Sequence, residues 1–232
     1  MLLHGFGDTP QSLSTQARAL HEQGWTVRVP LLPGHGRTLE AFQASIAAEW
    51  IAASREAYAS LRATHEHVSI VGLSMGGALA VLLAVEVPPR ALVLLAPYLE
   101  LSTSGRFWTT VWPIWSIWRA WIPGDAAASI HDPAARAESL GYGSASPWSL
   151  RQLREVADAA ATASSRLQAA TLVIHSVTDY RIAEATARTS FARLGTTTKQ
   201  LRWVENSGHV ITVDYDAALV TGAILEWLEQ HA

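Results

Sequence analysis

The sequence contains no cysteine. This absence excludes disulfide bonds, thiolate nucleophiles and metal sites built from cysteine. Charged residues make up only 16% of the chain, and Lys and Arg form no run that would suit nucleic acid. No apolar stretch approaches the ~18 residues that a membrane-spanning helix needs, and the N-terminus shows neither the basic nor the long apolar region of a signal peptide. We therefore expect a soluble cytoplasmic protein that binds no nucleic acid and does not insert stably into a membrane.

Apolar residues are abundant: they make up 49% of the 232 residues, enough for the core of one sizeable domain. Strand-like and helix-like segments alternate, which indicates an α/β fold with a mostly parallel sheet. Strands are predicted at Leu2–His4, Thr26–Leu32, Val68–Gly72, Ala91–Ala96, Thr171–His175 and Gln200–Val204. Helices are predicted near Gln11–Gln23, Ala44–Thr64, Met75–Val87, Ala183–Leu194 and Ala217–Glu229.

The alternation stops between about Leu99 and Arg166, where no strand is predicted. We expect residues 99–165 to form a helical cap inserted into a core of residues 1–98 and 166–232. The interval is rich in tryptophan, and Trp108, Trp112 and Trp115 recur at helical spacing, extended by Trp118 and Trp121. These rings either pack within the cap, or line an acyl pocket, or form a patch that touches lipid transiently.

The stretch Gly72-Leu73-Ser74-Met75-Gly76-Gly77 fits the G-x-S-x-G pattern of a nucleophilic serine on a sharp turn. An apolar β-branched run precedes it and a mostly apolar helical run follows, which is the strand–turn–helix setting that the pattern requires. The small residues at both flanks allow so tight a turn. Ser74 is therefore the predicted nucleophile.

A serine hydroxyl needs a base, and the base needs an acid that orients it. His209 lies in a loop after the last predicted strand, at the same end of the sheet as Ser74, and is the predicted base. Asp179 follows the strand before it and is the favoured acid. Three other carboxylates remain in competition, although two of them precede a helix where capping is the ordinary role: Glu205, Asp214 and Asp216.

The oxyanion of an acyl-transfer reaction is bound by backbone N–H groups in this arrangement. Met75 follows the nucleophile and supplies one. Phe6, within His4-Gly5-Phe6-Gly7, is the candidate for the second, since its glycine neighbours let the backbone approach. We also assign Gly5 and Val210 to substrate contact.

Together these pieces resemble the α/β-hydrolases, and more narrowly the small bacterial carboxylesterases related to monoacylglycerol lipases. The matching motifs are the four residues from His4, the elbow, Asp179, Pro33-Gly34-His35-Gly36 and Ser207-Gly208-His209-Val210-Ile211-Thr212. The resemblance implies a Ser-Asp-His triad, a small cap and esterase activity on short or medium acyl chains without a cofactor. Members of the family usually have one or two strands before the His-Gly strand, so we expect about six strands here, with Thr26–Leu32 at an edge.

The expected function is hydrolysis of small-molecule carboxylic esters, monoacylglycerols included, through an acyl-enzyme, with no cofactor or metal, by a monomer or homodimer. The same triad also serves amide, lactone or carbon–carbon cleavage and perhydrolysis. A non-catalytic binding protein that keeps the elbow as a scaffold is the alternative from another class. Fold alone does not decide between them.

Overall fold

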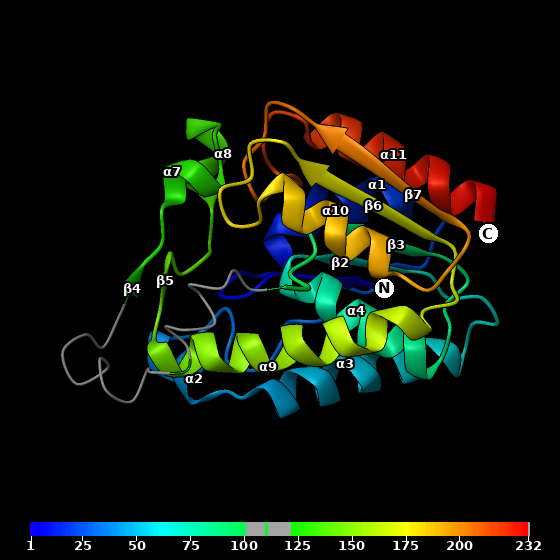
Figure 1. Ribbon diagram of the computed structural model, residues 1–232, viewed down its shortest axis with the longest axis horizontal. Helices are drawn as coiled ribbons and strands as arrows, with labels where there is room; N and C mark the ends of the chain where they lie inside the picture. The colour runs from blue at the N-terminus through cyan, green and yellow to red at the C-terminus, as the bar shows by residue number, and fades with distance from the viewer. Residues whose placement is uncertain (101–109, 111–121, 232) are drawn as a thin grey trace.

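The computed structural model describes residues 1–100, 110 and 122–231, with a five-stranded parallel sheet at its centre (Figure 1). The strand order is β1-β2-β3-β6-β7, so β1 and β7 form the edges. This is the predicted α/β fold class, and the number of strands is close to the six expected. The strands are β1 (Leu2–Leu3), β2 (Ile70–Leu73), β3 (Leu92–Leu95), β6 (Thr171–Ser176) and β7 (Lys199–Val204).

Helices cover both faces of the sheet, and alternate strand residues face each layer. In β3, Leu92 and Leu94 pack toward one layer, while Val93 and Leu95 pack toward the other. Because the central strands are buried on both faces, their sequences are continuous apolar runs. The first layer holds α3 (Ala47–Arg62), α4 (Met75–Glu86), α9 (Pro147–Ala163) and α10 (Glu184–Arg193), and the second holds α1 (Ser14–Glu22) and α11 (Ala217–His231).

Shorter elements join these layers: η1 (Pro10–Leu13), α2 (Leu39–Ala44) and η2 (Ser164–Arg166). Helix α2 had not been predicted, because six residues are too few to establish a helical period. Within the part of the chain that the structure describes, no helix has the length and apolar character needed to cross a membrane.

The segment predicted as a strand at Thr26–Leu32 is not one, although it lies beside β1. The Leu2 N–H donates to the Arg28 carbonyl oxygen at 2.8 Å, as in the first rung of a parallel ladder. The next rung of that register needs an N–H at Pro30, and proline has none. The pairing therefore stops after a single bond.

The interval between Leu99 and Arg166 contains elements that the sequence did not predict. Strand β4 (Ile122–Pro123) pairs antiparallel with β5 (Ser144–Ala145), so the expectation of no strand there is wrong. Two residues are too few to show an alternating pattern. Between these strands lie α7 (Ala126–Ser129) and α8 (Pro133–Glu138). The tryptophans at 108, 112, 115, 118 and 121 lie outside the described residues.

A cluster of buried rings supports the loop that follows β1. His4 donates from Nδ1 to the Gly5 carbonyl oxygen (2.9 Å) and accepts from the Leu32 N–H at Nε2 (3.1 Å), which fixes a neutral tautomer. The ring of His35 lies 5.1 Å from that of His4 and 4.8 Å from that of Phe42. Burial lowers the pKa of His4 to about 3 and that of His35 to about 4. Both histidines are therefore structural and uncharged in the folded protein.

The lowered pKa values of His4 and His35 predict that the protein loses stability in mild acid. Between pH 6.5 and about 4 the unfolded chain binds protons that the folded chain does not, so the free energy of unfolding falls with pH by about 1.4 kcal/mol per unit for each histidine. Replacing His35→Phe keeps a ring and removes one of the two titrations. Thermal melts from pH 7.5 to 4.5 should show a shallower decline for this variant, whereas His67→Gln, at an exposed position, should match the parent. Equal slopes in the parent and His35→Phe would contradict the assignment.

Candidate active site

Ser74 occupies a strained turn between β2 and α4. Its backbone has φ 53° and ψ −115°, a conformation that residues with side chains rarely adopt. The turn closes so tightly that a Cβ on Gly72 would collide with the Gly76 carbonyl oxygen, and one on Gly76 with the Leu3 carbonyl oxygen. The glycines of the motif are thus required by close backbone approach, and the turn lifts the Ser74 side chain above the carboxyl end of the sheet.

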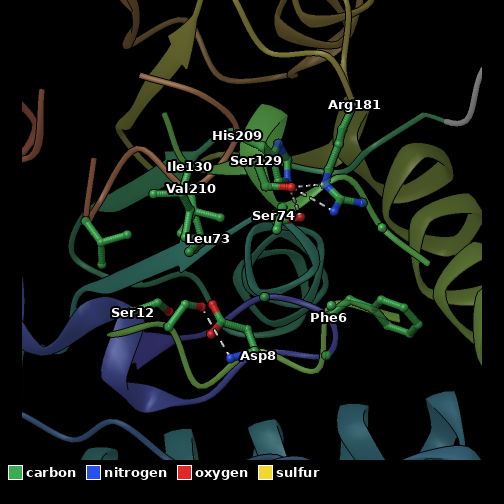
Figure 2. Close-up of a pocket in the computed structure, with 18 of the residues that line it drawn as sticks. Phe6, Asp8, Ser12, Leu73, Ser74, Ser129, Ile130, Arg181, His209 and Val210 are labelled. Atoms are coloured by element: carbon green, nitrogen blue, oxygen red, sulfur yellow. Dashed lines mark hydrogen bonds between the residues drawn. The ribbon is translucent and has the colours of Figure 1, made fainter. Parts of the chain in front are cut away.

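A chain of hydrogen bonds joins Ser74, His209 and Asp179 across three separate loops. Ser74 Oγ lies 2.8 Å from His209 Nε2, and His209 Nδ1 lies 2.7 Å from Asp179 Oδ2. The three residues are only 8%, 5% and 6% exposed, respectively. Figure 2 shows His209 and Ser74 meeting in the cavity. The structure therefore brings together the three side chains that the sequence analysis favoured.

Asp179 is fixed in place from its other side. Its Oδ1 accepts hydrogen bonds from the N–H groups of Arg181 (2.8 Å) and Ile182 (3.1 Å). Burial would raise the pKa of Asp179, but the charge of His209 and the bond to it outweigh burial, and the pKa lies below its ordinary value. The carboxylate thus stays ionised and keeps the His209 Nδ1 proton in place, which leaves Nε2 free to accept the serine proton.

His175 is fully buried next to this carboxylate. Its Nε2 is 3.1 Å from the Ile182 carbonyl oxygen and 3.3 Å from Asp179 Oδ2. Burial lowers its pKa, so the ring is neutral. It supports the loop that carries the acid.

The competing carboxylates have other roles. Asp214 accepts from the N–H groups of Gly208 (2.8 Å) and His131 (2.7 Å), and Asp216 accepts from Asn206 N–H at 2.8 Å. The carboxylates of Asp214 and Asp216 therefore hold the loop that carries His209, and Asp216 also directly precedes α11, where its carbonyl oxygen accepts from the Val220 N–H. The remaining competitor, Glu205, is exposed.

The two predicted oxyanion donors come from different segments of the chain. Met75 directly follows the nucleophile, and Phe6 lies in the loop after β1. Met75 is the first residue of α4, where N–H groups have no carbonyl partner within the helix. Phe6 follows Gly5, and a Cβ on Gly5 would lie 3.5 Å from the Ser74 Cβ. The loop after β1 therefore passes directly beside Ser74, as an oxyanion loop must.

A cavity of about 820 Å³ opens above Ser74. Gly5 and Val210, both predicted to contact substrate, line it, and so do several residues that the sequence analysis missed. Trp108, Trp112 and Trp115, also assigned to substrate, lie outside the described residues. The missed lining residues include Asp8, Tyr98, Ser129, Leu153 and Arg181. Asp8 and Arg181 each lie two residues beyond a predicted site residue, and that proximity was the available signal.

The segment around α7 and α8 is attached to the site by hydrogen bonds. The Val210 N–H donates to the Ser129 carbonyl oxygen (3.0 Å), and Arg181 Nη2 donates to Ser129 Oγ (2.9 Å). Asp214 adds the bond to the His131 N–H. These contacts make the segment around α7 and α8 a wall of the cavity.

The chemistry available at this site is acyl transfer. It has a nucleophile, a base held by an acid, and backbone N–H groups beside the nucleophile. No group of three or more His, Asp or Glu side chains within the described ranges is placed to hold a metal ion.

Comparison with known proteins agrees with this geometry. A thermostable monoacylglycerol lipase from Bacillus sp. (strain H-257) is 27% identical over 100% of this chain and 90% of its own, and a carboxylesterase from Bacillus subtilis (strain 168) is 25% identical over 99% and 92%. A solved structure reported for the metagenome-derived lipolytic enzymes LipS and LipT superposes with a TM-score of 0.87 at 28% identity, covering 99% of this chain and 92% of that one. The structure of the monoacylglycerol lipase of Paleococcus ferrophilus has a TM-score of 0.81 at 18% identity, over 100% and 93%, a likeness of fold alone.

The family model described as Hydrolase_4, serine aminopeptidase, S33, matches residues 1–216, nearly the whole chain. The protein therefore belongs to this family of α/β-hydrolases, within the group that resembles carboxylesterases and monoacylglycerol lipases.

Proposed function

We propose that the protein is a serine carboxylic-ester hydrolase that cleaves short- to medium-chain acyl esters, monoacylglycerols among them, through an acyl-enzyme. The observation that carries the proposal is the hydrogen-bonded chain from Ser74 through His209 to Asp179 at the base of the cavity. The names of the relatives support an ester as the scissile group.

The reaction follows from the geometry in two halves. His209 Nε2 accepts the proton of Ser74 Oγ as that oxygen attacks the ester carbonyl carbon, and Asp179 stabilises the imidazolium that forms. The N–H groups of Phe6 and Met75 bind the oxyanion of the tetrahedral intermediate. His209 then donates its proton to the leaving alcohol oxygen, and an acyl-Ser74 ester remains. In the second half, His209 takes a proton from water, the hydroxyl attacks the acyl carbon, and the acid leaves as Ser74 regains its proton.

We also propose the division of the chain into a core and a cap. The packing of α9 against α3 and α4 supports assigning this helix to the core. The Ser146 and Ser149 side chains cap the start of α9. We therefore propose that the cap ends near residue 146, earlier than the expected 99–165. Trp108, Trp112 and Trp115 stay candidates for acyl contact.

Three substitutions test the triad. Ser74→Ala and Asp179→Asn should each lower kcat for p-nitrophenyl butyrate by ~10⁴ or more with little change in the thermal midpoint, since the first removes the nucleophile and the second leaves His209 in the wrong tautomer. Asp214→Asn should instead lower the thermal midpoint and cost less activity, because Asp214 braces the His209 loop. Ser190→Ala, on α10, is the control for Ser74. A greater loss of kcat in Asp214→Asn than in Asp179→Asn would refute the assignment of the acid.

The third prediction concerns acyl-chain length. Each methylene that fits the cavity adds ~0.8 kcal/mol of burial, about a fourfold gain, whereas one that does not fit adds nothing. We expect kcat/KM to rise from acetyl to about C4–C8 p-nitrophenyl esters and then fall. Trp→Ala changes at 108, 112 and 115 should divide into variants that move this optimum and variants that only lower stability. If no variant moves the optimum, the tryptophans are cap packing and not pocket lining.

A further inference from the structure

Asp8 places a carboxylate in the cavity that the triad mechanism does not use. A Cβ on Gly5 would lie 3.5 Å from the Ser74 Cβ and 3.9 Å from the Asp8 Cβ, so Asp8 and the nucleophile flank the same point of the loop. In Figure 2, Asp8 and Ser12 lie on one side of Ser74, and Arg181 and Ser129 on the other. Within residues 1–100, 110 and 122–231, Asp8 takes part in no ion pair.

The hydrogen bonds of Asp8 leave it with acceptor capacity. Its Oδ1 accepts from the Thr9 N–H at 2.7 Å, and the Ser12 hydroxyl lies beside it. A carboxylate can accept about four hydrogen bonds. Burial raises the pKa of Asp8, against the effects of Ser12, Thr9 and His209. Asp8 is half-buried, so a donor that a ligand brings would meet an acceptor that is already partly removed from water.

The cavity differs in character on its two sides. Toward α9 its lining is apolar, with Tyr98, Ile122, Leu150 and Leu153. On the side of η1 and the start of α1 the lining is polar, with Gln11, Ser12, Ser14 and Thr15, Thr212 from the loop after His209, and the charged residues Arg136 and Glu138 of α8. Gln16 Nε2 donates to the Thr212 carbonyl oxygen (2.9 Å), which holds the two polar segments together.

This division orients an ester. Hydrocarbon buried against an ionised carboxylate leaves its charge without compensation, so an acyl chain is favoured on the α9 side. The alcohol part then points toward Asp8, within reach of His209, which must protonate its oxygen. An ammonium group there would be repelled when His209 becomes an imidazolium, whereas a neutral hydroxyl would not.

We propose that Asp8 selects esters whose alcohol part carries a free hydroxyl group, as in glycerol or sugar monoesters, by accepting a hydrogen bond from that hydroxyl. The proposal rests on the ester hydrolysis proposed above. Asp8 is thereby a specificity-determining residue that contacts the substrate and takes no part in bond breaking.

The test compares three butyrates that share an acyl group: 1-monobutyrylglycerol, n-propyl butyrate, which has the same carbon skeleton without free hydroxyls, and butyrylcholine. The parent, Asp8→Asn, Asp8→Leu and the control Glu22→Gln, an exposed acid at the end of α1, are measured with each. We expect the parent to prefer the glyceryl ester in kcat/KM. Asp8→Leu should lower the glyceryl-to-propyl ratio by about tenfold or more, because a site built to bond a hydroxyl loses that discrimination with its acceptor. The glyceryl-to-propyl ratio of Asp8→Asn should lie between those of the parent and Asp8→Leu, and the ratio of Glu22→Gln should equal that of the parent.

Each other outcome overturns the proposal. An equal fall on the glyceryl and propyl esters would assign Asp8 to the shape of the oxyanion loop, and a loss confined to butyrylcholine would make it an ammonium site. An unchanged ratio in both Asp8 variants would remove it from recognition. Asp8→Asn is nearly isosteric, and thermal midpoints identify any variant that fails to fold. If the parent hydrolysed none of the three esters, the proposed function itself would fail, whereas hydrolysis of all three without dependence on Asp8 would defeat only this inference.

Discussion

The hydrogen bond between Ser74 Oγ and His209 Nε2 is the contact on which the rest of the site depends. It joins the elbow after β2 to the loop after β7, two segments 135 residues apart in the sequence. Each partner is held in position by its own surroundings. The elbow fixes Ser74 through a strained backbone and glycine contacts, while Asp179 fixes the imidazole from behind. A serine with an ordinary hydroxyl is a poor nucleophile, and this arrangement provides the base that the proposed acyl transfer requires at neutral pH.

Much of the remaining structure holds these two loops in place beside each other. Asp214 and Asp216 hold the His209 loop, and Ser129 links the α7 segment to Val210 and Arg181. On the other side of the nucleophile, the Tyr142 N–H donates to the Gly7 carbonyl oxygen at 2.9 Å, and the Tyr142 ring stacks on Phe42. The segment from β4 to β5 therefore touches both the loop after β1 and the loop that carries His209. Because hydrogen bonds hold this segment at both loops, it can define the shape of the cavity as well as cover it.

The sequence predicts those features whose causes are local. The glycines around Ser74 specify a turn that their own close contacts require, and the apolar runs of β2, β3 and β6 specify buried parallel strands. Several features that depend on contacts between distant segments are not predicted from the sequence. Thr26–Leu32 looks like a strand, but Pro30 interrupts its pairing with β1. Asp214 stands where helix caps are common, yet its partner His131 is distant in the sequence, and no local pattern encodes that bond. The position of Asp8 in the cavity likewise follows from the path of a loop, and not from a motif.

The central claim is that Ser74 becomes acylated during ester hydrolysis. The most direct measurement is mass spectrometry of the protein after reaction with a fluorophosphonate and, separately, after acid quenching during turnover of p-nitrophenyl butyrate, with peptide mapping of the adduct. The account predicts a phosphonyl adduct and a butyryl adduct on the peptide that contains Ser74, with neither adduct in Ser74→Ala. An adduct on a different residue, or undiminished ester hydrolysis by Ser74→Ala, would contradict it.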